Sequence, residues 1–414
     1  MLGEPTELSD VWRSEVTNSV DDEGSGSMQF GISNRRRNER RHRLGFGLAL
    51  VLTAVVLAAA AAASAGTTGT IAQAKAIVAK AEKPVPGPSV PAFKASSVKG
   101  ANIWFVSFAL AIPYSQQVWA GVQQGAKALG AHVKSFDAKF SAAEVSRGIN
   151  LAVNAKADAI IVHSLPASLV APAIVKAHAA GIKIISAETQ NPGRPLPDVP
   201  KTVDALAGHS YSAKTRVFAA DIAADSNANA NVIFLSANDI GPGSKQGTAT
   251  FLQSMKQFCP KCSVKVEDAP VAQWSGLTQR IASLLRQNPK VNYVVPIFDG
   301  MAVYLVPGIQ SAGLASKVKI VTGDGTPSVL QELKNRNIVI GDAGQANVWT
   351  GLAIMDQTAR VLAGVKPLVD VKIPFRLFTT KNVGSLNLKL KDPTPWYTKA
   401  NVLAGYKRIW GVKK

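Results

Sequence analysis

Isolated carboxylates and aromatic rings follow several strand-like runs of this sequence. In Val-Thr-Gly-Asp-Gly-Thr-Pro (321–327), Asp324 stands between two glycines where an apolar run ends, and Asp299 follows another run. Tyr114 and Trp274 stand in the loops after two further runs. Carboxylates accept strong charge-assisted hydrogen bonds from hydroxyl groups, and aromatic rings pack on the C–H faces of sugars. The set predicts reversible binding of a small polyhydroxylated molecule, although either acid would also serve as a cap for the helix that follows it.

Signatures of enzymes are missing from the sequence. It contains no phosphate loop with Walker spacing, no G-x-G-x-x-G opening a helix, no G-x-S-x-G and no H-E-x-x-H. No loop after a strand pairs a nucleophile with a base. His178 lies inside a predicted helix, where a structural role is expected, whereas His163 follows a strand, where ligand contact and a structural role both stay open. We therefore expect no enzyme activity, no metal and no cofactor.

The two cysteines, Cys259 and Cys262, form a Cys-x-x-Cys pair. A zinc site needs two more ligands nearby, and none has suitable spacing. A thioredoxin-type site places such a pair at the start of a helix after a strand, but here the pair follows a predicted helix, 244–258, and precedes a predicted strand, 264–267. A local disulfide in an exported protein is the favoured interpretation, and thiol oxidoreductase chemistry is the alternative.

The N-terminal region carries an export signature. Residues 35–43 are rich in Arg, and residues 44–65 contain no charge and end in Ala-Ser-Ala. This order is typical of a signal peptide cleaved before Gly66, although the apolar stretch is also long enough to remain as a membrane anchor. We expect residues 1–65 to be a tail with a signal peptide or anchor, and the Pro-rich residues 66–98 to be a semi-rigid spacer. The rest then lies in the periplasm or on the outer face of the membrane.

The formal charge of +19 belongs to the part that is exported, because residues 1–65 hold seven Arg and eight acids. The lysines are scattered, and no basic helix carries interleaved aromatic residues, so no nucleic-acid partner is expected. A solvated basic surface near an anionic cell envelope accounts for the charge.

Apolar runs of strand length alternate with stretches of helical period. In residues 115–130, Val118 and Val122 recur at helical spacing, and Gly130 is placed to end the helix. This alternation indicates right-handed crossovers and parallel sheets. Two α/β lobes in series, with a crossing near Gly208, account for the pattern, and a closed barrel is the alternative. The runs are 101–108, 132–136, 159–162, 182–186, 231–236, 264–267, 293–297, 318–322 and 338–341.

Three long stretches resemble the ribose-type periplasmic sugar-binding proteins, the solute receptors of ABC importers. They are residues 101–130, 158–189 and 298–333. The most specific piece is Gly-Asp-Gly-Thr-Pro about two dozen residues after an Asp-x-Met-Ala helix start. The resemblance covers roughly 99–381 and implies the type I periplasmic-binding-protein fold, with two Rossmann-like lobes that have parallel sheets and are joined by a three-crossing hinge.

The resemblance also implies boundaries for the lobes and a set of ligand-binding residues. Lobe 1 is expected to comprise 99–208 and about 345–368, and lobe 2 is expected to comprise 209–344 and about 369–414. The implied ligand contacts are stacking rings at Tyr114 and Trp274, a polar group at His163, acids at Glu188 and Asp324, a cation at Lys245 and a hinge-side amide at Gln345.

Three departures make the expected pocket less cationic and more apolar than a standard pentose site. Thr189 follows Glu188 where the family often has Arg, Phe298 precedes Asp299 where an Asn is usual, and Ile112 replaces an Asn of the first loop. A sugar stays the leading expectation, with an apolar-decorated or non-sugar ligand as the alternative.

Together these features predict an exported substrate-binding protein, a monomer, that closes on a small sugar or sugar-like solute and delivers it to an ABC permease. A membrane-anchored sensory module with the same fold is the second hypothesis, because it would use the apolar segment 44–65 as its anchor.

Overall fold

The computed structural model describes residues 70–412. The predicted signal or anchor segment, residues 1–65, lies outside the described residues. Within the described part, no helix is both long enough and apolar enough to cross a membrane.

Lobe 1 is built on a five-stranded parallel sheet with the order β2-β1-β3-β4-β5. Helices α2 and α10 pack on one face, where Val118 and Val122 meet Phe105 and Ile161, and α3 and α4 cover the other face. The strands are β1 (Asn102–Ser107), β2 (His132–Asp137), β3 (Ala159–His163), β4 (Lys183–Ala187) and β5 (Ala205–Ala207); the helices are α2 (Pro113–Leu129), α3 (Ala142–Asn154), α4 (Ala171–Ala179) and α10 (Asn347–Leu362).

Lobe 2 is built on a six-stranded sheet with the order β11-β10-β9-β8-β6-β7. Its strands are parallel except β11, which pairs antiparallel with β10. The strands are β6 (Asn231–Ser236), β7 (Ser263–Asp268), β8 (Tyr293–Pro296), β9 (Lys319–Thr322), β10 (Val339–Gln345) and β11 (Phe375–Thr379); the helices are α5 (Tyr211–Asp225), α6 (Pro242–Phe258), α7 (Leu277–Gln287), α8 (Asp299–Ser311) and α9 (Pro327–Lys334).

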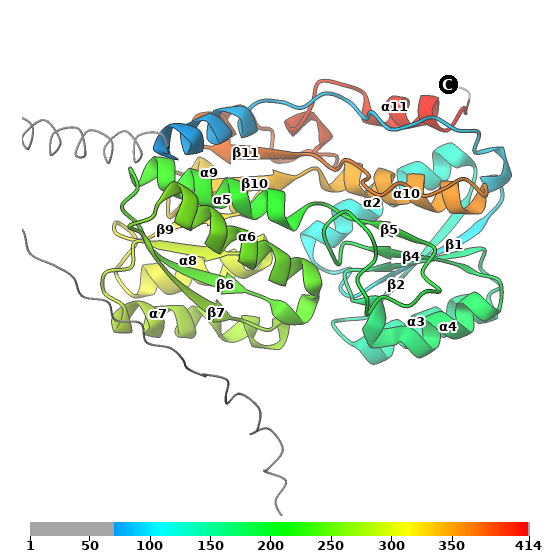
Figure 1. Cartoon of the computed structure of the whole chain (residues 1–414), viewed down its shortest axis with the longest axis horizontal. Helices are drawn as coiled ribbons and strands as arrows, with labels where there is room; N and C mark the ends of the chain where they lie inside the picture. Colours follow the sequence, from blue (N-terminus) through cyan, green and yellow to red (C-terminus); the bar gives the residue numbers. More distant parts are fainter. Residues whose placement is uncertain (1–69, 413–414) are drawn as a thin grey trace, which may run out of the picture. The chain divides into compact units, whose positions relative to one another are not determined.

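The chain passes between the lobes three times, from β5 to α5, from β10 to α10 and from α10 to β11 (Figure 1). Two separate α/β lobes confirm the predicted fold class, and the closed barrel is wrong, because the strands form two open sheets.

Local sequence explains how these elements begin and end. Helix α2 starts at Pro113, whose fixed φ suits the first helical position, and it buries Val118 and Val122. It ends at Gly130, which has φ 70° and donates its backbone N–H to the carbonyls of Ala126 and Lys127. A residue without a side chain adopts this left-handed conformation without strain.

The described part of the segment that was expected to be a semi-rigid spacer packs on the body. Residues 70–81 are helical, and Ala74 and Val78 are buried in the core. The extended stretch that follows donates backbone hydrogen bonds to the C-terminal segment, from Val85 to Tyr397 at 2.8 Å and from Phe93 to Ile409 at 2.8 Å. We call this pairing of residues 82–95 with residues 394–412 the clasp; its two segments lie side by side in Figure 1.

The last helix, α11 (Val402–Ile409), lies in the clasp and packs on lobe 1, although residues 369–414 were expected to belong to lobe 2. The hydroxyl of Tyr406 accepts a hydrogen bond from the Trp349 indole at 3.0 Å, and the Trp410 indole donates to Asp356 at 2.9 Å. Both partners are residues of α10, so the C-terminal segment returns to the first lobe after it leaves β11.

Candidate functional site

A cavity of about 330 Å³ lies between the two lobes. Its walls are the loops after β1, β2 and β3, the crossing into α5, and the loops after β6, β7, β8 and β9. The carboxyl ends of parallel strands meet at one edge of a sheet, so both sheets direct these loops to the same space. The volume falls within the range of small-molecule sites.

Aromatic side chains dominate the lining. The predicted rings Tyr114 and Trp274 both contribute, from lobe 1 and lobe 2 respectively. The Trp274 indole N–H donates to the Ala269 carbonyl at 2.9 Å, which fixes the ring, and Gly300 provides the space beside it, since a Cβ there would meet the indole. Five further rings complete the set: Phe108, Phe140, Tyr211, Phe298 and Tyr304.

Two predicted acids, Asp299 and Asp324, also line the cavity. Asp324 accepts hydrogen bonds from the Lys214 ammonium at 3.1 Å and from the Asp299 backbone N–H at 3.0 Å. Asp299 accepts from the Thr326 backbone N–H at 2.8 Å and from the Thr326 hydroxyl at 2.7 Å. Neither acid accepts a capping hydrogen bond from the helix that follows it. Asp324 instead accepts from the first residue of α8, and Asp299 accepts from the residue that precedes α9, so the two loops hold each other while both acids face the cavity.

Behind these two acids lies a third, Asp342 of β10, which is fully buried. Its Oδ1 accepts from the backbone N–H groups of Asp324 at 3.3 Å and Gly325 at 3.1 Å, and so it supports the Gly-Asp-Gly turn. We call Asp299, Asp324, Asp342 and Lys214 the Asp324 cluster.

Burial raises the pKa of every acid in the Asp324 cluster. For Asp299, burial and the neighbouring Asp324 raise the pKa to about 7, against the hydrogen bonds from Thr326. The pKa of Asp342 lies well above its usual value because of burial and the negative charges of Asp299 and Asp324. The pKa of Asp324 is also raised by burial, although the Lys214 ammonium opposes the increase. One ammonium group therefore does not offset the burial of these carboxyl groups.

Glu188, at the end of β4, is placed behind the cavity wall instead of in it. It accepts hydrogen bonds from the Tyr114 hydroxyl at 2.5 Å, His209 Nδ1 at 2.6 Å and the Gln345 amide at 2.8 Å. The His209 backbone N–H also donates to it, at 3.0 Å. We call Glu188, Tyr114, His209 and Gln345 the Glu188 cluster.

The Glu188 cluster joins lobe 1 to two of the three crossings. His209 lies in the crossing from β5 to α5, and Gln345 lies where β10 leads into α10. Burial alone would raise the pKa of Glu188, but the charge and hydrogen bond of His209, with the hydrogen bonds from Tyr114 and Gln345, lower it to about 2. Its backbone has φ 61°, a left-handed conformation that side-chain-bearing residues adopt only uncommonly.

Two further predicted residues are not brought into the cavity. His163 is fully buried behind Tyr114, with ring centroids 5.8 Å apart, and its nitrogens contact the hydroxyls of Ser107 and Ser164. Burial lowers its pKa to about 4, so the ring is neutral at physiological pH. Gln345 is also fully buried within the Glu188 cluster.

Lys245, the expected cation, is exposed on α6 and does not line the cavity. The neighbouring Ser244 points inward instead and accepts a hydrogen bond from the Ala237 backbone N–H at 3.1 Å. Since successive helical residues are about 100° apart around the axis, a shift of one residue separates a buried position from an exposed one. The buried cation beside the cavity is Lys214 of α5.

Sequence reasoning missed Lys214, His209 and Asp342. Lys214 did leave a signal, because it stands four and eight residues before Phe218 and Ile222 on the buried stripe of α5. A lysine on an apolar stripe needs a buried partner. His209 and Asp342 had no comparable signal.

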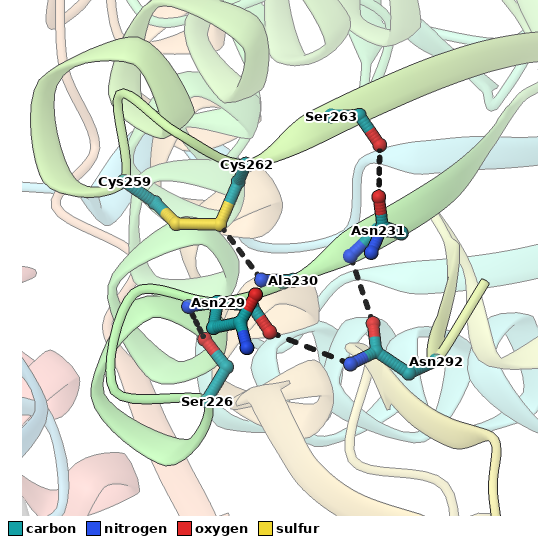
Figure 2. Close-up of a disulfide and its surroundings, with 8 residues drawn as sticks. All are labelled: Ser226, Asn229, Ala230, Asn231, Cys259, Cys262, Ser263 and Asn292. Atoms are coloured by element: carbon teal, nitrogen blue, oxygen red, sulfur yellow. Dashed lines mark hydrogen bonds between the residues drawn. A yellow bond between two sulfur atoms is a disulfide. The ribbon is translucent and has the colours of Figure 1, made fainter. Parts of the chain in front are cut away.

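Cys259 and Cys262 are joined in a disulfide, with Cα atoms 5.3 Å apart (Figure 2). Cys262 Sγ accepts a hydrogen bond from the Ala230 backbone N–H at 3.0 Å. The pair connects the end of α6 to the start of β7, at the amino ends of the strands. The cavity lies at the opposite, carboxyl ends, so the disulfide is no part of it.

No group of three or more His, Cys, Asp or Glu side chains in residues 70–412 is arranged to hold a metal ion. The arrangement offers rings, buried hydrogen-bond partners and a cavity between two lobes, which are the features of a binding site.

The sequence profile of the family described as periplasmic binding protein domain matches residues 103–366. A search of curated proteins finds no match. Similar solved structures include a solute-binding protein of an ABC transporter from Agrobacterium vitis with bound allitol, with a TM-score of 0.61 and 17% identity over 71% of this chain and 100% of that chain. A 5-methylthioribose transporter solute-binding protein from Thermotoga lettingae has a TM-score of 0.62 and 19% identity over 75% of this chain and 98% of that chain.

At these identities the structural likeness concerns the fold, whereas the profile match spans more than half of the chain. It agrees with the resemblance carried by the Gly-Asp-Gly-Thr-Pro turn and the strand-end loops. The chain belongs to the periplasmic binding protein domain family.

Proposed function

We propose that this chain is the exported substrate-binding protein of an ABC importer and that it holds a small sugar-like solute between its lobes. The observation that carries the proposal is the cavity of about 330 Å³ where the carboxyl ends of both sheets meet, lined by Tyr114, Trp274 and Asp324. The similar folds with bound allitol and 5-methylthioribose support a carbohydrate ligand. The family consists of substrate-binding components of transport systems, so no catalytic step is assigned.

The proposed ligand contacts are Tyr114, Trp274, Asp299 and Asp324, because these predicted residues line the cavity. His163, Glu188 and Gln345 support the wall from behind. A solute in the cavity touches both lobes and therefore favours the closed arrangement. The closed monomer would then be recognised by the permease at the outer face of the membrane.

The test is a calorimetric screen of sugars and polyols against the exported body, with one ring removed from the cavity. We expect at least one sugar or polyol to bind, and we expect Trp274→Leu to weaken its binding at least tenfold, because the ring loses its contact with the ligand. Trp104→Leu is the matched control, since Trp104 packs in lobe 1 away from the cavity.

Binding by Trp274→Leu that is as tight as binding by the unmodified protein would place the ligand outside this cavity. If none of the sugars or polyols binds the unmodified protein, the proposal is wrong.

A further inference from the structure

We infer that the solute is a sugar or polyol that carries a flat apolar substituent, and that it is held with a hydroxyl against His209 and its apolar end toward the cavity mouth. This inference rests on the proposed function and specifies its substrate class.

The composition of the wall is the first observation. Seven aromatic rings and seven aliphatic or proline side chains line the cavity, and its lining within residues 70–412 includes no Arg, Lys, Asn or Gln. Guanidinium and amide groups are the side chains that present several donors and acceptors at once. A free sugar would bring several hydroxyls into this space, and each buried hydroxyl without a partner is unfavourable.

The internal bonding of the polar wall groups is the second observation. All four carboxylate oxygens of Asp299 and Asp324 already accept hydrogen bonds from protein donors. The hydroxyls of Tyr114 and Tyr211 donate to Glu188, through its side chain and its backbone carbonyl respectively. A ligand hydroxyl at Asp299 or Asp324 would therefore share an oxygen that already accepts a hydrogen bond from the protein.

One unpartnered polar atom of the wall is His209 Nε2. His209 lines the cavity and is 2% exposed, yet its Nε2 has no hydrogen-bond partner. The carboxylate of Glu188 only accepts, so His209 Nδ1 must be the nitrogen that donates to it. In the neutral ring Nε2 then accepts a hydrogen bond, and in the charged ring it donates one; a hydroxyl group satisfies both cases.

A second unpartnered atom, Ser115 Oγ, belongs to a fully buried residue that also lines the cavity. Ser115 follows Tyr114 in the sequence. The Tyr114 hydroxyl and His209 Nδ1 both donate to the same oxygen of Glu188, so Tyr114 and His209 are held by one acceptor. Among the buried polar atoms of the described cavity lining, His209 Nε2 and Ser115 Oγ are the two without a hydrogen-bond partner, and we assign them to the polar end of the ligand.

Two exposed residues of the cavity wall indicate where the apolar end of the ligand lies. Phe140 of lobe 1 is 44% exposed and Val303 of lobe 2 is 46% exposed, and both line the cavity. Apolar groups of this size on opposite lobes would be covered by an apolar part of the ligand.

The test compares matched probes by calorimetry on the exported body: the methyl and phenyl β-glycosides of D-glucose, D-galactose and D-ribose, with benzyl alcohol as a probe that has no sugar. We expect a phenyl glycoside to bind about 10- to 100-fold more tightly than its methyl partner, from burial of the ring. We expect Val303→Ser to reduce this preference several-fold, and Val266→Ser to leave it unchanged, because Val266 is a comparably exposed valine of β7 outside the cavity.

A second measurement reads His209 directly. In ¹⁵N spectra of the histidine rings, the bound phenyl glycoside should shift Nε2 of His209 and leave His132, which is exposed on β2, unchanged.

Each failure has its own outcome. Methyl glycosides that bind as tightly as phenyl glycosides would overturn the inference and leave the proposed function standing. Binding of benzyl alcohol alone, or of no probe at all, would overturn the inference, and the proposed function is overturned only if the full screen of sugars and polyols also finds no ligand. An unshifted Nε2 in a complex with a phenyl glycoside would overturn the assignment to His209.

Discussion

The Glu188 cluster and the Asp324 cluster both bury carboxylates beside the same cavity, but they balance the negative charge differently. Glu188 is a single carboxylate that receives four hydrogen bonds. In the Asp324 cluster three buried carboxyl groups accompany one ammonium group, that of Lys214. The pKa of Glu188 is accordingly lowered to about 2, whereas the pKa of Asp299 is raised to about 7.

Because of this difference, Glu188 carries a permanent negative charge, whereas the charge of Asp299 varies with pH. Glu188 stays ionised across the physiological range, so it holds the two crossings and Tyr114 in one arrangement. Asp299 changes its protonation near neutral pH, and a carboxyl group donates a hydrogen bond when protonated but only accepts when ionised. The lobe 1 side of the cavity thus has fixed polarity, and the lobe 2 side can change its hydrogen-bonding character with pH.

The largest effect is expected when the permanent charge is removed. Glu188→Ala leaves His209, Gln345 and Tyr114 without their shared acceptor, and it should lower the free energy of unfolding by about 3–5 kcal/mol. Chemical denaturation of the exported body measures this loss. Glu144→Ala is the control, because Glu144 pairs with Arg147 on the surface of α3, and its removal should not change stability measurably. A similarly small effect at Glu188 would contradict the structural role of the Glu188 cluster.

The next effect concerns the cation of the Asp324 cluster. Lys214→Met removes the ammonium group that opposes the rise in the pKa of Asp324 and its hydrogen bond to that carboxylate, and it should lower the free energy of unfolding by about 2–3 kcal/mol at pH 8. The loss should shrink toward pH 5, since protonation relieves the unpaired carboxylate. Lys245→Met should leave stability unchanged, because Lys245 is exposed. A loss that is independent of pH would show that packing of Lys214, and not its charge, matters.

A smaller effect tests the variable charge itself. The pKa of Asp299 is raised in the folded protein, so its contribution to stability is fully present below its ordinary pKa and is lost as pH rises toward about 7. Asp299→Asn should therefore flatten the fall in unfolding free energy between about pH 4 and pH 7. The pKa of Asp221 is also raised to about 7, so Asp221→Asn, measured alongside, shows how much of the fall arises outside the Asp324 cluster. An unchanged slope in Asp299→Asn would mean that Asp299 does not titrate in this range.

The smallest effect tests how redundant the donors of the Glu188 cluster are. Tyr114→Phe removes one of its four hydrogen bonds and should lower the free energy of unfolding by about 1 kcal/mol. The lowered pKa of Glu188 means that its stabilisation is present above its ordinary pKa and is lost as pH falls toward about 2. Acid denaturation of Tyr114→Phe should therefore begin at higher pH than in the unmodified protein. A loss as large as that of Glu188→Ala would show that the donors act as one unit.

The rule that loops after parallel strands form the site predicted much of the cavity from sequence. Tyr114, Trp274 and Asp324 follow three strands that the pattern identified, and all three line the cavity. The buried partners were not predictable in this way, because Lys214 and Asp324 are far apart in the chain and meet only through packing of α5 beside β9. A residue at the end of a strand can face the cavity or lie behind its wall, as Glu188 does. Side-chain packing decides between the two positions, and the periodicity of the sequence does not predict that packing.

The clasp has a consequence for the order in which the protein folds. Phe93 and Ala95 donate their backbone N–H groups to Ile409 and Trp410, so these bonds join opposite ends of the described chain. Contacts between distant residues form late, because the intervening chain must first be ordered. A chain that stops before Val402 would leave both amides unpaired. The clasp can therefore form only when the last helix is present, so it closes the two ends of the described chain after the lobes between them have been ordered.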